Sequence, residues 1–460
     1  MEMIRQLREN KPSQTTCRGA AAGVRVVCIM AVLFVGLSPL ETGRVVAAEP
    51  ARKAEPVEVA ATIRLSVDEA IAVFLKQNLD LLISQFGIDY AKGQQITAAL
   101  FPNPYLTLGT VGSFLKQQLG QPSNITRSGQ VITMVQQLFE MAGKRGYRIE
   151  SADFGTQSAE ANFEDAVRQL GFTVKDVYYR VQLAQRRLAL AEENRDRFAR
   201  ILEVNTIRFK KGYIAEVDLI RIRLQIIDFQ SQVIQYIQEA DIARADLRQL
   251  LRLSPLTQVE LTTDLDYKPI DPDITSLRRV ALEIRPDIRA KRHTQSQRVA
   301  DLKLANAYRY PDVTIGAGYG VQGAVGPDLQ NQGMVNVGVP LPLFNRNQGG
   351  IMQAEVGVQQ AEADLMKTIN QVENEVDVAY RNLSQSRRLV ETYRAGVLDD
   401  ARLTLTIVER AYERGGATIL DLLDAARTSR TIQLNYIESL YNYQHNFFML
   451  ESAVGKGLTS

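Results

Sequence analysis

The sequence contains one long unit twice. Residues 101–109 read FPNPYLTLG and residues 308–316 read YRYPDVTIG, with Pro104 matching Pro311 at an offset of 207 residues. Solenoid proteins repeat every few tens of residues, whereas a period this long indicates one whole structural unit used twice. The chain is therefore expected to fold into two versions of the same arrangement.

The repeat continues beyond these two segments. RFKKGYIAEVDL (208–219) lies over AYERGGATILDL (411–422), so that Gly212 matches Gly415. The length of 460 residues would by itself suggest about three domains, but the duplication favours two intertwined halves. The predicted parts are a first repeat at 65–251, a connecting equatorial segment at 252–276 and a second repeat at 277–455.

The N-terminus has the features of a targeting signal. Five basic residues up to Arg25 precede an apolar run at 26–37, and small residues follow at Ala47-Ala48. This order is typical of a secretory signal peptide, and a run of about a dozen residues is too short to span a bilayer as a helix. We predict a signal peptide over 1–48 and an extended linker over 49–64, with a single-pass anchor as the alternative.

The composition argues against several classes of function. A net charge of +2 with interleaved basic and acidic residues provides no concentrated basic face, so no nucleic acid partner is expected. Both cysteines, Cys17 and Cys28, lie in or before the apolar run, which leaves no disulfide or thiolate site in the mature chain. His293 and His445 lack carboxylates at ligand spacing. We expect no cofactor, no metal site and no enzymatic activity, because no acid–base pair or nucleophile triad is present.

Alternating side chains predict two strand hairpins. From Val313 to Tyr319, apolar residues alternate with threonine and glycine, which is the period of a strand whose two faces meet different surroundings. Strands of about ten residues can cross a membrane when tilted, although a half-buried sheet in a soluble domain would show the same alternation. The predicted strands are about 104–113, 129–139, 311–321 and 333–343.

Long stretches without proline follow each hairpin and show heptad spacing. Val167, Val174 and Val181 recur every seven residues, which predicts left-handed coiled-coil packing. A helix of about 65 residues would be about 100 Å long, too long for an ordinary globular core. The fold class is α+β and mostly α. The predicted long helices are about 142–208, 216–251, 350–412 and 418–453, with tip turns at Gly212, Gly415 and Gly416.

Four strands per chain are too few to close a membrane barrel, for which about eight are needed. An open sheet edge in lipid would leave backbone groups unsatisfied at high cost. If the strands are transmembrane, the chain must oligomerise. Three copies would give an even twelve strands.

This order of elements resembles the TolC-like outer membrane efflux proteins, and the motifs look most like the CzcC-like branch for heavy-metal (cobalt-zinc-cadmium) efflux. The segments that carry the resemblance are RPDI (285–288), YPDVTIGAGYG (310–320), PLPLFNRNQGG (340–350) and YERGGATILDLLDA (412–425). The resemblance implies a homotrimer in outer-membrane lipid, with a trimeric 12-stranded β-barrel on a 12-helix α-barrel tunnel that lies in the periplasm. It also implies docking to a periplasmic adaptor (membrane fusion) protein and an inner-membrane RND-type pump.

Such a protein would be a passive exit duct for heavy-metal cations or for drugs. Two alternatives remain open. One is an outer-membrane conduit for type I protein secretion. The other is a soluble periplasmic coiled-coil scaffold.

The resemblance also implies a periplasmic constriction. Asp421 and Asp424 match aspartates that line it in the family, Asp218 matches Asp421 through the internal repeat, and Tyr412 aligns with a tyrosine of the closed-state contacts. Carboxylates brought close by threefold symmetry would raise one another's pKa and attract cations. In the structural alternative, Thr418 caps a helix with Asp421 as its partner, where an acidic residue also favours the helix dipole.

Overall fold

A computed structural model describes residues 62–111, 130–322 and 330–458. The chain divides into two units, Met1–Val57 and Glu58–Ser460, and all described residues belong to the second unit. The predicted signal peptide and all but the last three residues of the predicted linker lie outside the described residues. The described part is mostly helical, as predicted, and none of its helices is long and apolar enough to cross a membrane.

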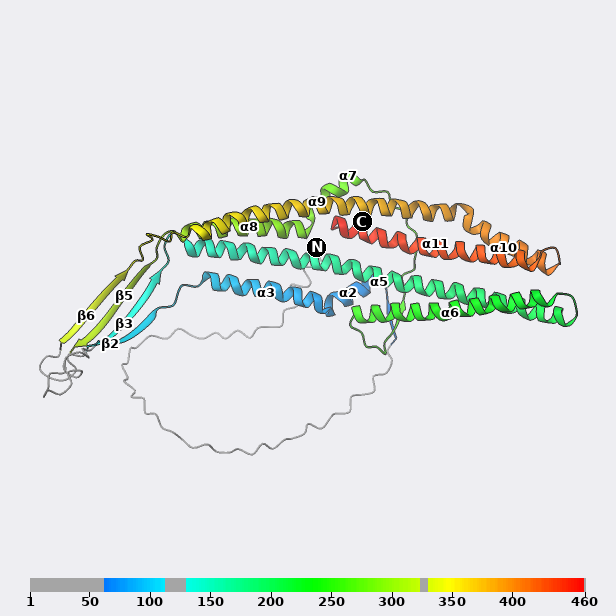
Figure 1. Ribbon diagram of the computed structural model, residues 1–460, viewed down its shortest axis with the longest axis horizontal. Helices are drawn as coiled ribbons and strands as arrows, with labels where there is room; N and C mark the ends of the chain where they lie inside the picture. The colour runs from blue at the N-terminus through cyan, green and yellow to red at the C-terminus, as the bar shows by residue number, and fades with distance from the viewer. Residues whose placement is uncertain (1–61, 112–129, 323–329, 459–460) are drawn as a thin grey trace, which may run out of the picture. The chain divides into compact units, whose positions relative to one another are not determined.

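The elements follow one another in two similar series (Figure 1). The strands are β1 (Thr62–Leu65), β2 (Tyr105–Val111), β3 (Gln130–Phe139), β4 (Gln258–Leu261), β5 (Val313–Gln322) and β6 (Gln330–Gly338). The helices are α2 (Val67–Gln77), α3 (Leu79–Ala99), α5 (Lys144–Lys210), α6 (Glu216–Leu250), α7 (Ile274–Ile284), α8 (Pro286–Ala307), α9 (Gln348–Thr392), α10 (Leu398–Glu413) and α11 (Ile419–Val454), with a π-helical turn, η1 (Tyr393–Val397), between α9 and α10.

In each series, a short helix is followed by a longer one. Ser66 and Glu69 form a capping box at the start of α2, which satisfies two backbone N–H groups that have no partner inside the helix. Asn78 ends α2 and caps α3, its Oδ1 accepting from the backbone N–H of Asp80 at 2.8 Å. The break between α7 and α8 falls at Arg285, which matches Asn78 at the offset of 207.

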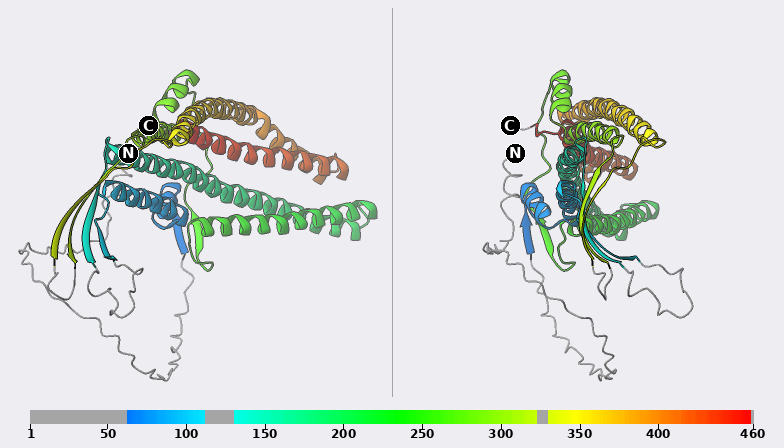
Figure 2. Two further views of the ribbon diagram at one scale, coloured as in Figure 1. Left: turned by 60° about the vertical axis from the view of Figure 1, so that its left-hand side comes forward. Right: turned by 90° about the vertical axis from the view of Figure 1, so that its left-hand side faces the viewer.

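The four long strands form one antiparallel sheet in the order β2-β3-β5-β6, and Figure 2 shows it as a single curved layer. Its register places Leu106, Val135, Ala317 and Val335 in one row across the sheet. All four side chains are exposed, so the apolar face of the sheet has no partner within one described chain.

The last strand ends earlier than predicted. The predicted strand at 333–343 corresponds to β6, which begins at Gln330 and stops at Gly338. Pro340 and Pro342 follow closely, and proline has no N–H to donate to a neighbouring strand. The prediction of a strand to residue 343 was therefore wrong.

The two long incoming helices differ. α5 runs without interruption for 67 residues, whereas the predicted continuous helix at 350–412 was wrong: it is divided into α9, η1 and α10. Gly396 in η1 has φ 129° and ψ −22°. An α-helix cannot contain this backbone conformation, and residues other than glycine rarely adopt it. The step between α9 and α10 is visible in Figure 1.

The core has two parts. The larger one lies where β1, β4 and the short helices meet the long helices, and it contains the fully buried side chain of Tyr178. The Tyr178 hydroxyl donates to the carbonyl of Leu65 at 2.9 Å and accepts from the N–H of Thr263 at 3.0 Å. This side chain therefore connects α5 to the ends of both strands of the parallel β1–β4 pair. The smaller part lies near the hairpin tips.

Candidate site at the tips of the helical hairpins

Both hairpin turns end their incoming helix with the same pair of hydrogen bonds. In the first, Gly212 has φ 78°, its N–H donates to Phe209 at 2.9 Å, and the N–H of Tyr213 donates to Arg208 at 2.9 Å. This is the Schellman arrangement, in which a left-handed residue after the helix lets two terminal carbonyls find donors. The first tip turn therefore needs glycine at residue 212.

The second turn repeats this geometry. Gly415 has φ 77°, its N–H donates to Tyr412 at 3.1 Å, and the N–H of Gly416 donates to Ala411 at 2.8 Å. Gly416 lies in this turn, where the sequence analysis placed it. Its φ is not positive, so its backbone could accept another residue, unlike that of Gly415.

A small apolar core holds the two hairpins together behind these turns. It contains residues from α5, α6, α10 and α11. Phe198 of α5 packs against Phe229 of α6 with ring centroids 4.8 Å apart, and Leu422 of α11 is fully buried in the same cluster. Because all four helices contribute, the two tips are positioned relative to each other by packing within one chain.

Polar contacts join the two tips directly. The Tyr412 hydroxyl donates to Asn205 Oδ1 at 2.8 Å, and Arg208 Nη2 donates to the carbonyl of Glu413 at 2.7 Å. Burial raises the pKa of Tyr412, and the negative charge of Asp218 acts in the same direction, while Arg208 opposes them. Tyr412 is therefore a neutral hydrogen-bond donor at physiological pH.

A cavity of about 570 Å³ lies between the tips. Asp218 and Tyr412 both line it, so the structure brings these two predicted site residues to one place. Asp218 Oδ1 is 3.5 Å from Arg221 Nη1, and both side chains are partly exposed, so this ion pair is weak. The lining combines three arginines with two acidic residues.

Asp421 does not line this cavity itself, but its hydrogen-bond partner Thr418 does, and the two residues form a capping box at the start of α11. Its carboxylate accepts from the Thr418 N–H at 2.8 Å and from the Thr418 hydroxyl at 2.7 Å, while its own N–H donates to Thr418 Oγ1. These hydrogen bonds lower the pKa of the exposed Asp421 carboxyl. Asp424 is exposed about one turn further along α11. Both carboxylates are thus accessible to solvent.

The described residues contain no group of three or more histidine, cysteine, aspartate or glutamate side chains placed to hold a metal ion. Asp421 and Asp424 of a single chain are only two carboxylates. A larger set would require several copies of the chain around one axis.

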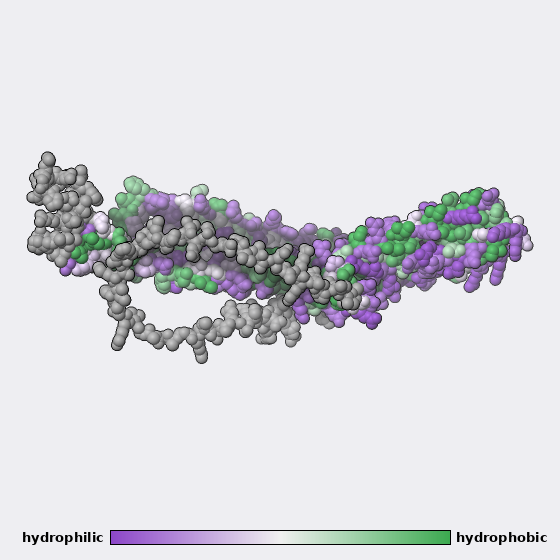
Figure 3. Space-filling view, turned by 90° about the horizontal axis from the view of Figure 1, so that it is seen from below, coloured by the Kyte–Doolittle hydropathy of each residue, from purple (hydrophilic) through white to green (hydrophobic). Residues whose placement is uncertain are grey.

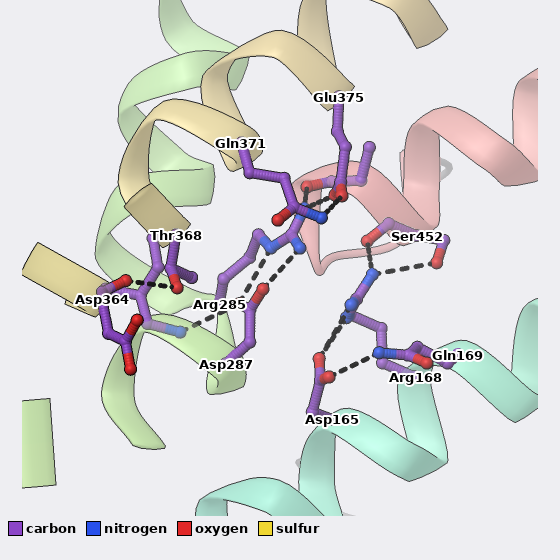
Figure 4. A network of polar contacts seen from close by, with 12 residues as sticks. Asp165, Arg168, Gln169, Arg285, Asp287, Asp364, Thr368, Gln371, Glu375 and Ser452 are labelled. Atoms are coloured by element: carbon purple, nitrogen blue, oxygen red, sulfur yellow. Dashed lines mark hydrogen bonds and ion pairs between the residues drawn. The ribbon is translucent and has the colours of Figure 1, made fainter. Parts of the chain in front are cut away.

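The motif RPDI carried the family resemblance, but the sequence did not predict what Arg285 does. The Arg285 guanidinium is 2% exposed and bonds Asp287 at 2.6 Å, Glu375 at 2.7 Å and the carbonyl of Ala453 at 2.9 Å. Figure 4 shows Asp287 and Glu375 converging on it from α8 and α9. Burial raises the pKa of Asp287, but the hydrogen bonds and charge of Arg285 outweigh it and leave that pKa lowered. Arg285 thereby connects α8, α9 and the end of α11.

A second arginine binds the same end of α11. Arg168 of α5 donates to the carbonyl of Ser452 at 2.6 Å and forms an ion pair with Asp165 (Figure 4). The last carbonyls of a helix have no partner inside it and favour nearby cations. Two arginines from distant parts of the chain therefore fix the end of the final helix.

Comparison with known proteins gives one family and two informative relatives. The family described as "Outer membrane efflux protein" matches residues 70–251 and 277–456. The cobalt-zinc-cadmium resistance protein CzcC of Cupriavidus metallidurans is 25% identical over 373 residues, covering 81% of this chain and 86% of CzcC. The outer membrane protein TolC of Escherichia coli is 24% identical over 381 residues, covering 76% of this chain and 74% of TolC.

The fold is also similar to that of solved structures. CusC, whose crystal structures concern folding and transmembrane channel formation, matches with a TM-score of 0.72 at 20% identity. The match covers 85% of this chain and 92% of CusC.

Proposed function

We propose that this chain, which belongs to the outer membrane efflux protein family, is the outer-membrane exit duct of a tripartite efflux system. It would conduct substrates passively from a periplasmic adaptor and an inner-membrane RND-type pump to the exterior. Membership of the family carries the proposal. The energy would come from the pump, so the chain itself would have no hydrolytic activity.

The duct would be a homotrimer. One chain provides a four-stranded sheet with β2 and β6 at its two edges, and its apolar face is exposed. Three copies would join edge to edge and supply the twelve strands of one barrel in outer-membrane lipid. The long helices would form a twelve-helix tunnel in the periplasm, with the hairpin tips at its far end.

The tips would form the periplasmic constriction. Asp421 and Asp424 are accessible on α11 near the second turn, and threefold symmetry would make six carboxylates of them. Asp218 and Tyr412 line the cavity between the two hairpins, where the Tyr412–Asn205 hydrogen bond would help to hold the tips in one arrangement. A ring of carboxylates attracts cations and repels anions.

Heavy-metal cations are the proposed substrates, with drugs as a second possibility. CzcC is named for cobalt, zinc and cadmium resistance and is 25% identical to this chain. An acidic constriction agrees with the passage of cations. A strain that lacks the gene should become sensitive to divalent metals. If the strain kept its metal tolerance but became sensitive to drugs, drugs would be the substrates instead.

The constriction is tested by conductance of the purified protein in planar bilayers. Asp421→Asn combined with Asp424→Asn should lower the preference for cations over anions and raise the basal conductance, because charges are lost where the passage is narrowest. Asp399→Asn with Asp400→Asn is a matched control on the same hairpin, where both side chains are exposed. Unchanged selectivity in the Asp421 and Asp424 variant would contradict the acidic constriction.

Localisation is tested separately by fractionation. An SDS-resistant trimer in the outer-membrane fraction is the expected result. A soluble monomer in the periplasm would contradict the exit duct and favour a coiled-coil scaffold.

A further inference from the structure

In the described chain, four connections join the sheet to the helices, and hydrogen bonds tie these connections together. Lys144 Nζ, at the start of α5, donates to the carbonyl of Tyr310, just before β5, at 2.8 Å. Arg145 Nε donates to the carbonyl of Ala99, at the end of α3, at 2.8 Å. The side chain of Asn347, just before α9, donates to a carbonyl of α8 at 2.8 Å. We call the four connections the collar, which consists of residues 100–105, 139–145, 308–312 and 339–347.

The collar exposes large apolar side chains. Leu341 is 76% exposed, Leu343 65% and Phe344 93%. They follow directly on Val337 and Val339, which are exposed at the end of β6 and just after it. Figure 3 shows hydrophobic patches at this end of the molecule, where the sheet and the helices join. A contiguous exposed apolar surface of this kind marks a contact with a partner or a membrane.

The internal repeat indicates that a neighbouring copy would leave Phe344 partly uncovered. Phe139 holds the matching place in the first repeat, because Leu138 lies over Leu343. The second repeat already lies beside it, since Phe139 pairs with Val313 of β5. Phe139 is nevertheless 49% exposed. Another environment must therefore face this position, and in a membrane that environment is lipid.

The collar also has unpaired positive charge. Its two acidic residues, Glu140 and Asp312, already form ion pairs with basic residues of α5. Arg309 and Arg346 are exposed, and neither has an acidic partner in the described part of the chain. The guanidinium of Arg145 lies over an aromatic ring, 4.1 Å from its centroid. Arginine binds phosphate well, because its planar fork can donate two parallel hydrogen bonds.

We infer that the collar binds anionic phospholipid of the periplasmic leaflet. Arg309 and Arg346 would bind the headgroup phosphate, while Leu341, Leu343 and Phe344 would lie among the acyl chains. The inference rests on the proposed outer-membrane duct, whose helices lie in the periplasm and whose collar therefore meets that leaflet. It adds a lipid class that the duct would recognise. Basic side chains beside an apolar surface suit such a lipid, because they match both of its ends.

Tryptophan fluorescence tests the contact with acyl chains. The sequence contains no tryptophan, so a single introduced tryptophan reports only its own surroundings. Phe344→Trp should lose most of its emission in vesicles of phosphatidylcholine with brominated chains, because bromine quenches the indole ring on contact. Tyr213→Trp, at a position 76% exposed in the first tip turn, is the matched control and should keep its emission. Equal emission of Phe344→Trp in brominated and unbrominated vesicles would overturn the inference.

The headgroup preference is tested with the same reporter. Brominated phosphatidylglycerol, diluted into unbrominated phosphatidylcholine, should quench Phe344→Trp more strongly than brominated phosphatidylcholine at the same mole fraction. Adding Arg309→Gln and Arg346→Gln should remove this preference, a loss of about tenfold in relative lipid binding, and should leave quenching by phosphatidylcholine intact. Lys211→Gln with Arg414→Gln removes two exposed charges at the tips and should keep the preference. A preference that survives in the Arg309 and Arg346 variant would refute the assignment of the headgroup.

Fractionation separates this inference from the proposed function. An SDS-resistant trimer in the outer-membrane fraction, with no quenching of Phe344→Trp, would overturn lipid binding by the collar and leave the duct in place. A soluble monomer in the periplasm would overturn both.

Discussion

The first and second hairpins end their incoming helices alike but start their outgoing helices differently. At both turns a glycine with φ near 78° accompanies the same two hydrogen bonds. α6 then starts at Ala215 with no side-chain cap, whereas α11 starts at Thr418 with a complete capping box. The backbone conformation of the turn is thus the same in both repeats, whereas the side chains that cap the following helix differ.

The same contrast appears where the short helices meet the long ones. Asn78 and Arg285 occupy matching positions between a short and a longer helix, but Asn78 bonds only the first turn of α3. Arg285 reaches two carboxylates and a carbonyl on three other elements. This position therefore caps one helix in the first repeat, whereas in the second repeat it connects distant segments of the chain.

Replacing Arg285 should have the largest effect on stability. Arg285→Ala would leave Asp287 and the carbonyl of Ala453 without their main partner, and breaking a buried ion pair costs about 3–5 kcal/mol. The urea midpoint of the detergent-solubilised protein, followed by far-UV circular dichroism, should fall accordingly. Arg285→Lys keeps the charge but loses the planar fork, so an intermediate midpoint is expected. A midpoint equal to wild type would contradict the bridging role.

Acid should weaken the same network. The pKa of Asp287 is lowered in the folded protein, so its contribution is complete above the unfolded value and is lost as pH falls through the folded value. The urea midpoint of wild type should therefore drop below about pH 4. It should drop less steeply in Arg285→Ala, which has already lost the partner. If the urea midpoints of the two proteins fell in parallel with pH, the ion pair of Asp287 with Arg285 would not be the cause of the acid sensitivity.

A matched pair of glycines tests the difference between the incoming helices. Gly396→Ala should destabilise by about 1–3 kcal/mol, because φ 129° is strained for a residue with a Cβ. Gly171 lies in the uninterrupted α5, where a methyl group added to its Cα would meet no atom within 4 Å. Gly171→Ala should stabilise by up to about 1 kcal/mol. Urea unfolding of both variants measures the contrast, and effects of equal sign would contradict it.

Asn78→Ala should cost about 1 kcal/mol, the usual effect of losing a helix cap. The comparison with Arg285→Ala, at the matching position, is the informative measurement. If both variants lost the same free energy of unfolding, the two repeats would use this position in the same way.

The smallest effect is expected from restoring the missing cap of the first hairpin. Ala215→Thr would recreate Thr-x-x-Asp with Asp218, as in Thr418 and Asp421, and should stabilise by at most about 1 kcal/mol. Thr418→Ala is the reciprocal variant and should raise the pKa of Asp421 toward its ordinary value, measurable by carboxyl-carbon NMR. If Ala215→Thr were destabilising, the present contact of Asp218 with Arg221 would contribute more to stability than a capping box would.

The sequence predicted features that depend on regular spacing. Heptad spacing indicated a mostly helical chain, and the repeated motifs indicated the family. Glycine near the end of a heptad pattern marked both turns, because glycine tolerates positive φ. The roles of Asp421, Asp424, Asp218 and Tyr412 remain predictions, since they concern several copies of the chain.

Features that depend on a single residue or on distant partners were missed. A glycine inside a helix costs only about 1 kcal/mol, so Gly396 gave no strong signal of a break. The partners of Arg285 lie as far as 168 residues along the chain, and no local pattern links them. The Tyr412–Asn205 bond joins residues 207 apart and was equally invisible.

The small parallel pair of β1 and β4 has a consequence for the order of folding. Their pairing joins Arg64 to Glu260, 196 residues apart. Closing a flexible loop of that length costs about 5 kcal/mol in chain entropy. The intervening helices must therefore be largely assembled before the pair forms. The β1–β4 pair would then form only after the helical hairpin of the first repeat has folded. Formation of β1 would be a late step in the folding of this repeat.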